Sequence, residues 1–247
     1  MLDLDFDDIE EQAEAVEPEA PEEAPRAIIV WDDVAQGSAE WHALRAGKWT
    51  GSRAEDLIAR NAKDYTPLKA RKDYVASVVL ERLTGEAAND GGSFKQTRWG
   101  HEQEPNARAA YEIHRGVLTH TPPFVRLAAL PNVGMSPDAL VLERKRIVGG
   151  VEIKCPHDGR IHINTLRNGM PPEHMPQVQW ELWVAGAQWW DFVSYDPRLP
   201  ERLQLFIQRI EPDLDMHALF EREVELAEKE VQAQLDTLNA YTLEEAA

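Results

Sequence analysis

The sequence predicts an α/β fold with a central mixed β-sheet flanked by helices. Its 247 residues, 43% of them hydrophobic, are enough for one sizeable domain with a full core. Strand-like segments are grouped in the middle of the chain, at 125–130, 132–135, 139–142 and 147–154. Two helices, expected near 160–168 and 173–186, separate this group from further strands at 189–195 and 203–210. Strands on either side of a helix pair imply a sheet that is covered on both faces.

Two short helices are expected before the strands. Ser38 has the position of an N-cap for a helix that Gly47 ends. Ser52 and Glu55 have the spacing of a capping box, which predicts that a second helix opens at Ser52.

A third helix is expected to open at Thr66-Pro67 and to end at Gly85. Its apolar stripe consists of Leu68, Val75, Val78, Val79 and Leu83. Residues 86–96 are expected to form a loop. Pro105 predicts that the following helix starts near Glu104 or kinks there, because proline has no N–H to donate inside a helix.

Acidic residues are concentrated at the two ends of the chain. The formal net charge is −18, but residues 1–25 hold eleven acids and no base, and residues 211–247 hold eleven acids and two bases. The segment between them has 22 acids against 24 bases, so the body of the protein is close to neutral. We expect 1–26 to be a disordered acidic tail, and 27–247 to be a single domain that ends in a long helix at about 213–240.

Composition excludes several classes of protein. No apolar run approaches the ~20 residues that span a bilayer, and the acidic N-terminus is unlike a signal peptide. We therefore expect a soluble, cytoplasmic protein with no membrane partner. Cys155 is the only cysteine, which excludes an internal disulfide and a four-cysteine iron–sulfur cluster. We interpret Cys155 as a small buried residue rather than a nucleophile.

The most informative feature is an aspartate followed by Glu-x-Lys on an apolar strand. Val151 and Ile153 alternate with Glu152 and Lys154, so a strand places both charged side chains on one face. Asp138 lies fourteen residues before Glu152. Two carboxylates and a backbone carbonyl suit Mg²⁺, which prefers oxygen ligands and keeps several waters. Because an ammonium group beside the ion can orient a water or stabilise charge on phosphate, the pattern indicates a metal-dependent nuclease.

The Glu-x-Lys triplet alone is a weak signal. A second triplet, Glu143-Arg-Lys145, lies in a charged run up to Arg146 that has no apolar flanks and is typical of a hairpin turn. Glu152 and Lys154 could also form an exposed cross-strand ion pair, which contributes about 0.2–1 kcal/mol. Ser136-Pro-Asp138 and the segments that follow favour the nuclease.

Eight sequence blocks together point to one family. They are Trp41-His-Ala-Leu-Arg45-Ala-Gly47, Thr50-Gly-Ser52, Trp99-Gly100, Glu104-Pro-Asn-Ala-Arg108, Ser136-Pro-Asp138, Glu152-Ile-Lys154-Cys-Pro156, Pro176-Gln177-Val-Gln179 and Tyr195-Asp-Pro197. In this order they resemble the lambda exonuclease family, also called YqaJ-type viral recombinases, of the PD-(D/E)xK nuclease superfamily. The resemblance covers roughly residues 38–210. It implies a restriction-endonuclease-like core.

The resemblance also implies an activity. It predicts a Mg²⁺-dependent exonuclease that degrades duplex DNA in the 5′→3′ direction, releases 5′-mononucleotides and leaves 3′ single-stranded overhangs. Such overhangs serve homologous recombination by single-strand annealing. The implied cofactors are two Mg²⁺ ions in each active site, with Mn²⁺ as a substitute. The implied partners are DNA with a free 5′ end, a single-strand annealing protein and further copies of the chain in a homotrimeric ring.

Matching motifs then suggest a role for each site residue. Asp138, Glu152 and the backbone carbonyl of Ile153 are expected to bind the catalytic metal. Glu104 would add a carboxylate to the two-metal site, directly or through water. Lys154 would position the nucleophilic water. Gln177 would orient a water or a phosphate, although from sequence alone it could be an ordinary exposed amide.

Arg45 and Ser52 match the family's pocket for a terminal 5′-phosphate, and Ser136 is expected to assist them. Arginine makes bidentate, charge-assisted bonds to phosphate, and a helix that opens at Ser52 offers free N–H groups. Helix capping alone would also explain Ser52, and Arg45 could be an ordinary surface charge. The four tryptophans of the later segments are expected in the core or a subunit interface rather than on DNA bases: Trp180, Trp183, Trp189 and Trp190.

Two positions depart from the family pattern. His174 stands where the family often has a tyrosine, so a contact to phosphate or to a metal-bound water would become pH-sensitive. Thr97 stands where an apolar wedge separates the strands in the family's best-known member. How the strands separate in this protein is therefore open.

Two alternative functions of the chain, and two interpretations of its tail, remain at this stage. The chain could be a structure- or sequence-specific endonuclease with the same core. It could also be a non-catalytic scaffold that binds DNA ends, although the full set of Asp138, Glu152 and Lys154 argues against a broken metal site. The tail at 1–26 could only add solubility, or it could dock on a basic partner or compete with DNA for the protein's own groove.

Overall fold

The computed structural model describes residues 26–30, 34–87 and 94–241, with the side chains of 94–97 excepted. The acidic tail predicted at 1–26 therefore lies outside the described residues, apart from Arg26. No helix in the described ranges is long and apolar enough to cross a bilayer.

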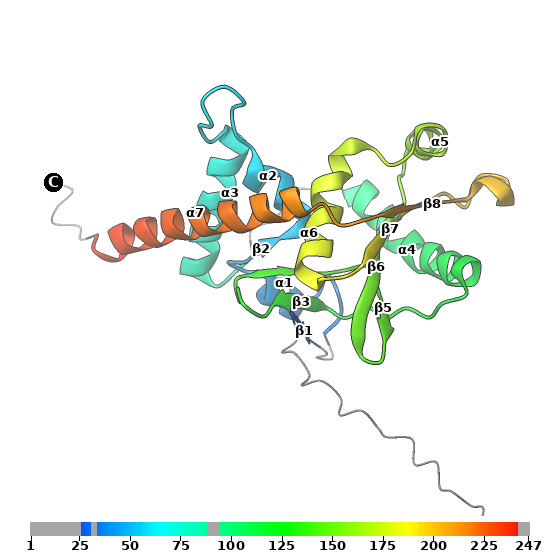
Figure 1. The fold of residues 1–247 in the computed structure, drawn as a ribbon, viewed down its shortest axis with the longest axis horizontal. Coiled ribbons are helices and arrows are strands. Elements are labelled where there is room, and N and C mark those ends of the chain that lie inside the picture. The colour runs from blue at the N-terminus through cyan, green and yellow to red at the C-terminus, as the bar shows by residue number, and fades with distance from the viewer. Residues whose placement is uncertain (1–25, 31–33, 88–93, 242–247) are drawn as a thin grey trace, which may run out of the picture.

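The strands form two four-stranded mixed sheets (Figure 1). The first has the order β1 (Ala27–Val30), β3 (Phe124–Leu127), β4 (Val133–Met135) and β2 (Trp49–Thr50). The second has the order β5 (Ala139–Glu143), β6 (Arg146–Lys154), β7 (Trp189–Tyr195) and β8 (Leu205–Ile210). In the second sheet β6 and β7 are parallel and the other two pairs are antiparallel. The predicted α/β class is confirmed, with the mixed strands divided between two sheets rather than one.

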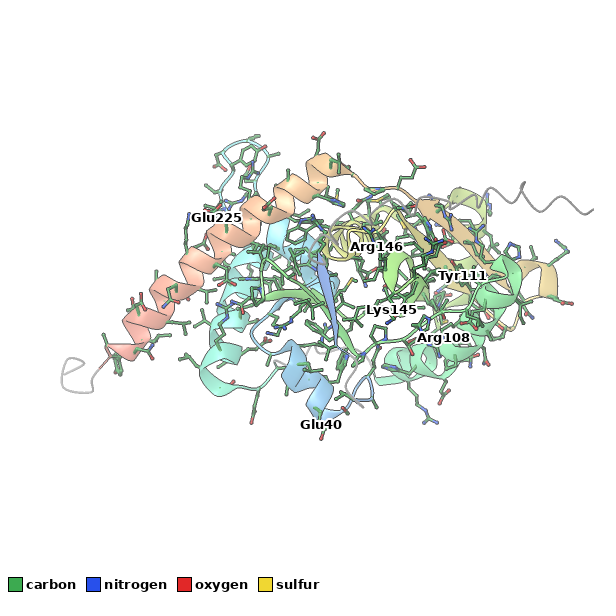
Figure 2. All side chains as sticks on the ribbon, turned by 60° about the horizontal axis from the view of Figure 1, so that its bottom comes forward. Glu40, Arg108, Tyr111, Lys145, Arg146 and Glu225 are labelled. Atoms are coloured by element: carbon green, nitrogen blue, oxygen red, sulfur yellow. The ribbon has the colours of Figure 1, made fainter. Side chains whose placement is uncertain are left out.

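Helix α6 (Met175–Ala185) joins the two sheets. It contacts β3 and β4 of the first sheet and β6 and β7 of the second. Helix α4 (Phe94–Arg115) covers the other face of the second sheet, where Tyr111 packs with Val151 and Ile153 (Figures 1 and 2). The second sheet thus lies between two helices, as a sheet with two apolar faces requires.

The long helix α7 (Leu214–Asn239) forms an outer helical layer with α2 (Ala54–Ile58) and α3 (Lys69–Thr84). Its buried apolar residues recur at helical spacing: Phe220, Val224, Ala227 and Val231. Asp213 caps its first turn by accepting a hydrogen bond from the Met216 N–H. The predicted helix at about 213–240 is confirmed.

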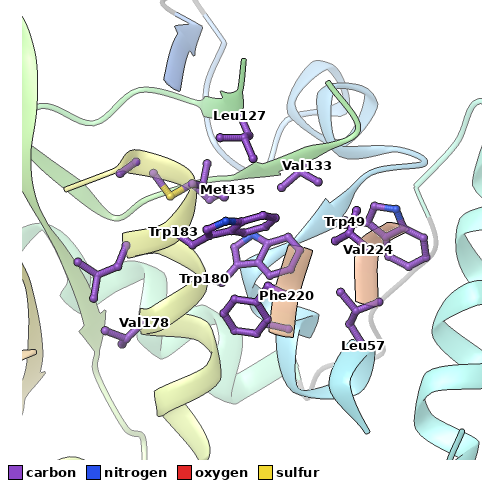
Figure 3. Close-up of a cluster of buried hydrophobic side chains, with 14 of the residues drawn as sticks. Trp49, Leu57, Leu127, Val133, Met135, Val178, Trp180, Trp183, Phe220 and Val224 are labelled. Atoms are coloured by element: carbon purple, nitrogen blue, oxygen red, sulfur yellow. The ribbon is translucent and has the colours of Figure 1, made fainter. Parts of the chain in front are cut away.

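Aromatic side chains fill the core between α6 and α7. Trp180 and Trp183 pack edge-on at 5.0 Å between ring centroids, and Phe220 of α7 lies 5.2 Å from Trp180 (Figure 3). Trp180, Trp183 and Trp190 are at most 3% exposed, which confirms their prediction as core residues. Trp189 is partly exposed, and the Arg209 guanidinium lies 3.7 Å above its ring.

Several local predictions are confirmed. Ser38 caps α1 (Ala39–Arg45) by accepting the Trp41 N–H, and Gly85 ends α3 in the left-handed conformation. The charged run from Glu143 to Arg146 is the hairpin turn between β5 and β6. Arg144 and Lys145 both have positive φ there, as a tight two-residue hairpin requires. The second Glu-x-Lys triplet is therefore part of an exposed turn.

The two helices predicted near 160–168 and 173–186 are confirmed as α5 (Gly159–Asn168) and α6, and a 3₁₀ turn, η2 (Pro172–His174), precedes α6. Helix α3 begins at Lys69, slightly later than predicted, and two ends of its expected apolar stripe, Leu68 and Leu83, are exposed.

Two predictions of helix starts are wrong. Ser52 does not cap a helix, because it lies inside the 3₁₀ turn η1 (Gly51–Arg53) and α2 starts only at Ala54. Helix α4 begins at Phe94 rather than near Glu104, so residues 94–96 belong to a helix and not to a loop, and Pro105 lies within it. Lysine, glutamine and arginine in 95–98 favour the helix, and one missing N–H does not end it.

Candidate active site

The side chains of strand β6 point alternately to its two faces. Val151 and Ile153 point into the apolar cluster under α4. Glu152, 2% exposed, and Lys154 point to the other side, toward α6. The alternation expected for a strand therefore delivers a buried carboxylate and an ammonium group to one helix.

Asp138 lies immediately before β5, and a hydrogen bond fixes its position beside β6. Its Oδ2 accepts the backbone N–H of Ile153 at 2.6 Å. Because Ile153 lies between Glu152 and Lys154, the bond brings all three predicted catalytic side chains to the same end of the sheet.

Lys154 is held from two sides. Its Nζ lies 2.5 Å from Glu152 Oε1 on the same strand and donates to Gln177 Oε1 of α6 at 3.3 Å. Gln177 is therefore a contact of Lys154, the lysine predicted to be catalytic, and not an isolated surface amide. About a third of the Lys154 side chain, 34%, is exposed and can meet a substrate.

The carboxylates strongly influence one another. Burial raises the pKa of Asp138 well above its usual value, and the charges of Glu152 and Glu104 raise it further. Burial also raises the pKa of Glu104, while Arg108 and His101 oppose the shift. For Lys154, burial alone would lower the pKa, but Glu152 and Asp138 outweigh it and raise the pKa. Clustered carboxylates with raised pKa values are what a divalent cation would stabilise in ionised form.

A cavity of about 230 Å³ opens at this end of β6. Its lining residues are Gly100, His101, Glu104, Ile153, Lys154 and Cys155. Burial, with neighbouring carboxylates, raises the pKa of Cys155 to about 12, so the thiol stays neutral, as expected for a residue that is not a nucleophile. Glu104 from α4 thus faces the same space as Lys154 from β6, as predicted.

The donor set fits a hard divalent cation. Among the described residues, no group of three or more His, Cys, Asp or Glu side chains is arranged so that it could hold a metal ion. The predicted ligands Asp138, Glu152 and the Ile153 carbonyl are therefore only a partial set, and Glu104 and Ile153 both line the cavity. Mg²⁺ usually binds through one or two carboxylates and keeps several waters, so a partial set is sufficient for it.

Three residues predicted to bind phosphate meet beside this site. Arg45, at the end of α1, donates from Nη1 to Ser136 Oγ at 3.0 Å and from Nη2 to Ser52 Oγ at 3.2 Å. The Arg45 guanidinium also lies 4.5 Å above the ring of Trp41. Arg45, Ser52 and Ser136 form one cluster, the Arg45 group. Because Ser136 is only two residues from Asp138, this group and the carboxylates are neighbours.

Turn η1 is packed closely against helix α6. A Cβ on Gly51 would lie 3.1 Å from the Trp180 ring and 3.7 Å from Gln177 Cγ. Ser52 is therefore held near Gln177 by a close backbone approach. This tertiary contact explains why Ser52 lies beside Arg45, from which it accepts a hydrogen bond, instead of opening a helix.

A second, smaller cavity of about 50 Å³ borders Arg45. Lys48 and Arg53 line it together with Trp41 and Tyr74. The Arg53 guanidinium lies 4.0 Å above the Tyr74 ring. Burial lowers the pKa of Lys48, and the charges of Arg126 and Arg82 lower it further, so several cations lie on this side of Arg45, with Glu81 among the residues that line the cavity.

Glu181 also lies at this site, although it was not among the residues predicted from the sequence. It is 1% exposed, and its Oε1 accepts a hydrogen bond from Gln177 Nε2 at 3.2 Å. Burial raises the pKa of Glu181 well above its usual value, and Glu152 and Asp138 raise it further. A single acid within Trp180–Ala185, an otherwise apolar run, was the available signal, because lone buried acids are rare without a partner.

The two departures from the family pattern have different outcomes. His174 stacks on Phe192 at 5.2 Å, and burial lowers its pKa, with Lys154 lowering it further. It therefore borders the site as a neutral ring near pH 7. The side chain of Thr97 lies outside the described part of the chain.

Comparison with known proteins decides the family. Residues 40–188 match the YqaJ-like viral recombinase domain. The chain belongs to the YqaJ-like viral recombinase family. No curated protein shows significant similarity to it. Among solved structures, it is similar to an alkaline exonuclease, LHK-Exo, from Laribacter hongkongensis, with 36% identity, a TM-score of 0.71 and coverage of 82% of this chain and 96% of that chain.

Two further solved structures are similar to this YqaJ-like family member. LHK-Exo has also been solved in complex with dAMP, and that structure is 37% identical, has a TM-score of 0.71 and covers 81% of this chain and 96% of its own. A phage-related exonuclease from Haemophilus somnus 129PT has the same fold at 16% identity, with a TM-score of 0.60 and coverage of 77% of this chain and 96% of that chain.

Proposed function

We propose that this protein is a Mg²⁺-dependent exonuclease that digests double-stranded DNA from the 5′ end. It would release 5′-mononucleotides and leave 3′ single strands for recombination by single-strand annealing. The observation that carries the proposal is the Asp138–Ile153 hydrogen bond, which brings two carboxylates and a lysine together at the end of β6. Family membership supports the nuclease class, because a similar protein of known structure, LHK-Exo, is an alkaline exonuclease.

Asp138, Glu152 and the Ile153 carbonyl would hold the metal, with Glu104 as a further carboxylate for a second ion; Mn²⁺ is expected to substitute for Mg²⁺. When bound, the ions acidify a water and stabilise charge on the phosphate oxygens. Lys154 orients the attacking water, and its charge stabilises the phosphate as negative charge develops. Gln177 supports Lys154 by accepting a hydrogen bond from its ammonium group.

The Arg45 group accounts for the choice of a 5′ end. Arg45, Ser52 and Ser136 present hydrogen-bond donors next to the catalytic carboxylates, which suits a terminal phosphate one nucleotide away from the bond that is cut. Lys48 and Arg53 add positive charge on the same side. The complex of LHK-Exo with dAMP agrees with a mononucleotide product.

The proposed partners are duplex DNA with a free 5′ end, a single-strand annealing protein and two further copies of the chain in a trimeric ring. The endonuclease and the non-catalytic scaffold remain the competing functions. All three functions make different predictions for linear and circular DNA.

Two labelled substrates test the proposal. Linear duplex carrying a label at the 5′ or the 3′ end is incubated with the protein in Mg²⁺ or in a chelator, beside a closed circular duplex. We expect the 5′ label to appear first as a mononucleotide, in Mg²⁺ only, with the circle intact. Cleavage of the circle would support an endonuclease, and binding of ends without any release would support a scaffold.

A further inference from the structure

A ring of four polar side chains connects β6 to α6 at the candidate catalytic cluster. Lys154 Nζ contacts Glu152 Oε1 and donates to Gln177 Oε1. Gln177 Nε2 in turn donates to Glu181 Oε1. Glu181 also lies against the carboxyl group of Glu152, which closes the ring. Two residues of the strand and two of the helix, one turn apart, thus hold one another.

The two ends of the Gln177 amide are not interchangeable in this ring. An ammonium group cannot accept a hydrogen bond, so the amide oxygen has to face Lys154. The amide nitrogen then needs an acceptor on its other side, and Glu181 Oε1 provides one at 3.2 Å. Lys154 and Glu181 together therefore determine which way the amide is turned.

Glu181 is an unfavourable residue for the stability of the fold at its position. The side chain is 1% exposed in the middle of an apolar helix, and among the described residues no N–H or O–H group donates to its Oε2. A buried carboxyl group with one oxygen lacking a donor contributes less to stability than an apolar side chain of similar size would. Its position next to Gln177 and Glu152 points to a function in the active site instead.

We propose that Glu181 is a positioning residue of the exonuclease site, holding the Gln177 amide so that its oxygen fixes the Lys154 ammonium group. Glu181 does not touch substrate. It acts through Gln177, because its removal takes away the acceptor that holds the Gln177 amide nitrogen and leaves the amide free to turn away from Lys154. This inference rests on the proposed nuclease function for its consequence, but the hydrogen-bond geometry stands independently of it.

Glu181→Leu, Glu181→Gln and a control in the same helix test the proposal. Gln179 is a suitable control, because it is also buried, at 2% exposure, but bonds Glu211 and Asp213 rather than Lys154. Glu181→Leu should lower kcat roughly 10- to 100-fold, as loss of a supporting residue does, with the KM for DNA ends unchanged and a folded protein of undiminished Tm. Glu181→Gln, which keeps an acceptor oxygen, should restore most of kcat. Gln179→Leu should lower Tm and leave kcat unchanged.

A second readout does not require activity. The side-chain amide of Gln177, observed by nitrogen-15 NMR and identified by its loss in Gln177→Met, should be protected from hydrogen exchange in the wild type. In Glu181→Leu its exchange should be roughly tenfold faster or more. Loss of protection without any duplex digestion by the wild type would refute the proposed function and leave the positioning role intact.

Three results would overturn the proposal. They are an unchanged kcat in Glu181→Leu, a loss of kcat that Glu181→Gln shares in full, and failure of Glu181→Leu to fold. The last would show that the side chain is needed for the fold rather than for the site.

Discussion

The backbone N–H of Ile153 donates to Asp138 Oδ2 at 2.6 Å, so a residue before β5 is fixed to the centre of the Glu-x-Lys triplet on β6. This bond determines where Asp138 stands relative to Glu152.

The raised pKa of Asp138 leads to a prediction for the metal-free protein. Burial and two neighbouring carboxylates disfavour its ionised form in the fold, so the folded pKa exceeds the unfolded pKa of 3.8. Stability is therefore lost as pH rises from about 4 through the folded pKa. Asp138→Asn removes this loss while its amide oxygen can still accept the Ile153 N–H.

We expect Asp138→Asn to release no nucleotides and to have a Tm a few degrees above wild type at pH 7, since 1 kcal/mol corresponds to about 2–4 °C for a domain of this size. The difference should shrink as the pH falls toward 4. Thermal unfolding in a chelator across this pH range measures it. A lower Tm for the variant at pH 7 would contradict the electrostatic explanation.

Arg45 should contribute to the digestion of 5′-phosphorylated ends but not of 5′-hydroxyl ends. Arg45→Gln is expected to lower kcat/KM on 5′-phosphorylated duplex roughly 10- to 100-fold, because a hydrogen bond to a charged group contributes about 1.5–3 kcal/mol. Digestion of 5′-hydroxyl duplex should stay near the wild-type rate. Arg160, whose side chain is 89% exposed and pairs with Asp158, is the matched control. An equal loss on both kinds of end would exclude a phosphate pocket at Arg45.

Anchoring of α4 to the second sheet should depend on Tyr111. Its hydroxyl donates to Asp191 Oδ2 at 2.9 Å, and both side chains are fully buried. Tyr111→Phe should reduce the free energy of unfolding by about 1.5 kcal/mol, because the buried carboxylate loses a donor. Urea denaturation tests this, with the exposed Tyr241→Phe as a control. A change as small as that of the control would show that Arg209 and Arg115 satisfy Asp191 without Tyr111.

Cys155 should react slowly despite its place in the cavity wall. Its pKa of about 12 leaves very little thiolate at pH 8, and the thiolate is the reactive form. Alkylation by iodoacetamide, followed by mass spectrometry, should be at least about tenfold slower in the native protein than in urea. Equal rates would show that the thiol is not shielded by burial and by nearby carboxylates.

Local periodicity was sufficient to predict which side chains of β6 point to one face. Glu152 and Lys154 share a face because a strand has a period of two, and that pattern is visible in four consecutive residues. The division into two sheets was not visible, because β4 and β5 are separated by only three residues. Strand β2 has two residues, too few to show any period, and it depends on pairing with β4.

The roles of residues that depend on tertiary packing were harder to predict from the sequence. The spacing of Ser52 and Glu55 satisfies a helix-capping pattern, but the contact of Gly51 with Trp180 and Gln177 places Ser52 beside Arg45 instead. Glu181 has no motif of its own in the sequence. It joins the site only because α6 packs on β6 with Gln177 facing Lys154.

Anomalous diffraction from crystals soaked in Mn²⁺ tests the central claim most directly. We predict a manganese peak about 2.1 Å from carboxylate oxygens of both Asp138 and Glu152, with the Ile153 carbonyl as a further ligand. A fully soaked crystal with no peak between these two side chains, or with manganese bound elsewhere and their carboxylates turned apart, would contradict the assignment of this cluster as the catalytic centre.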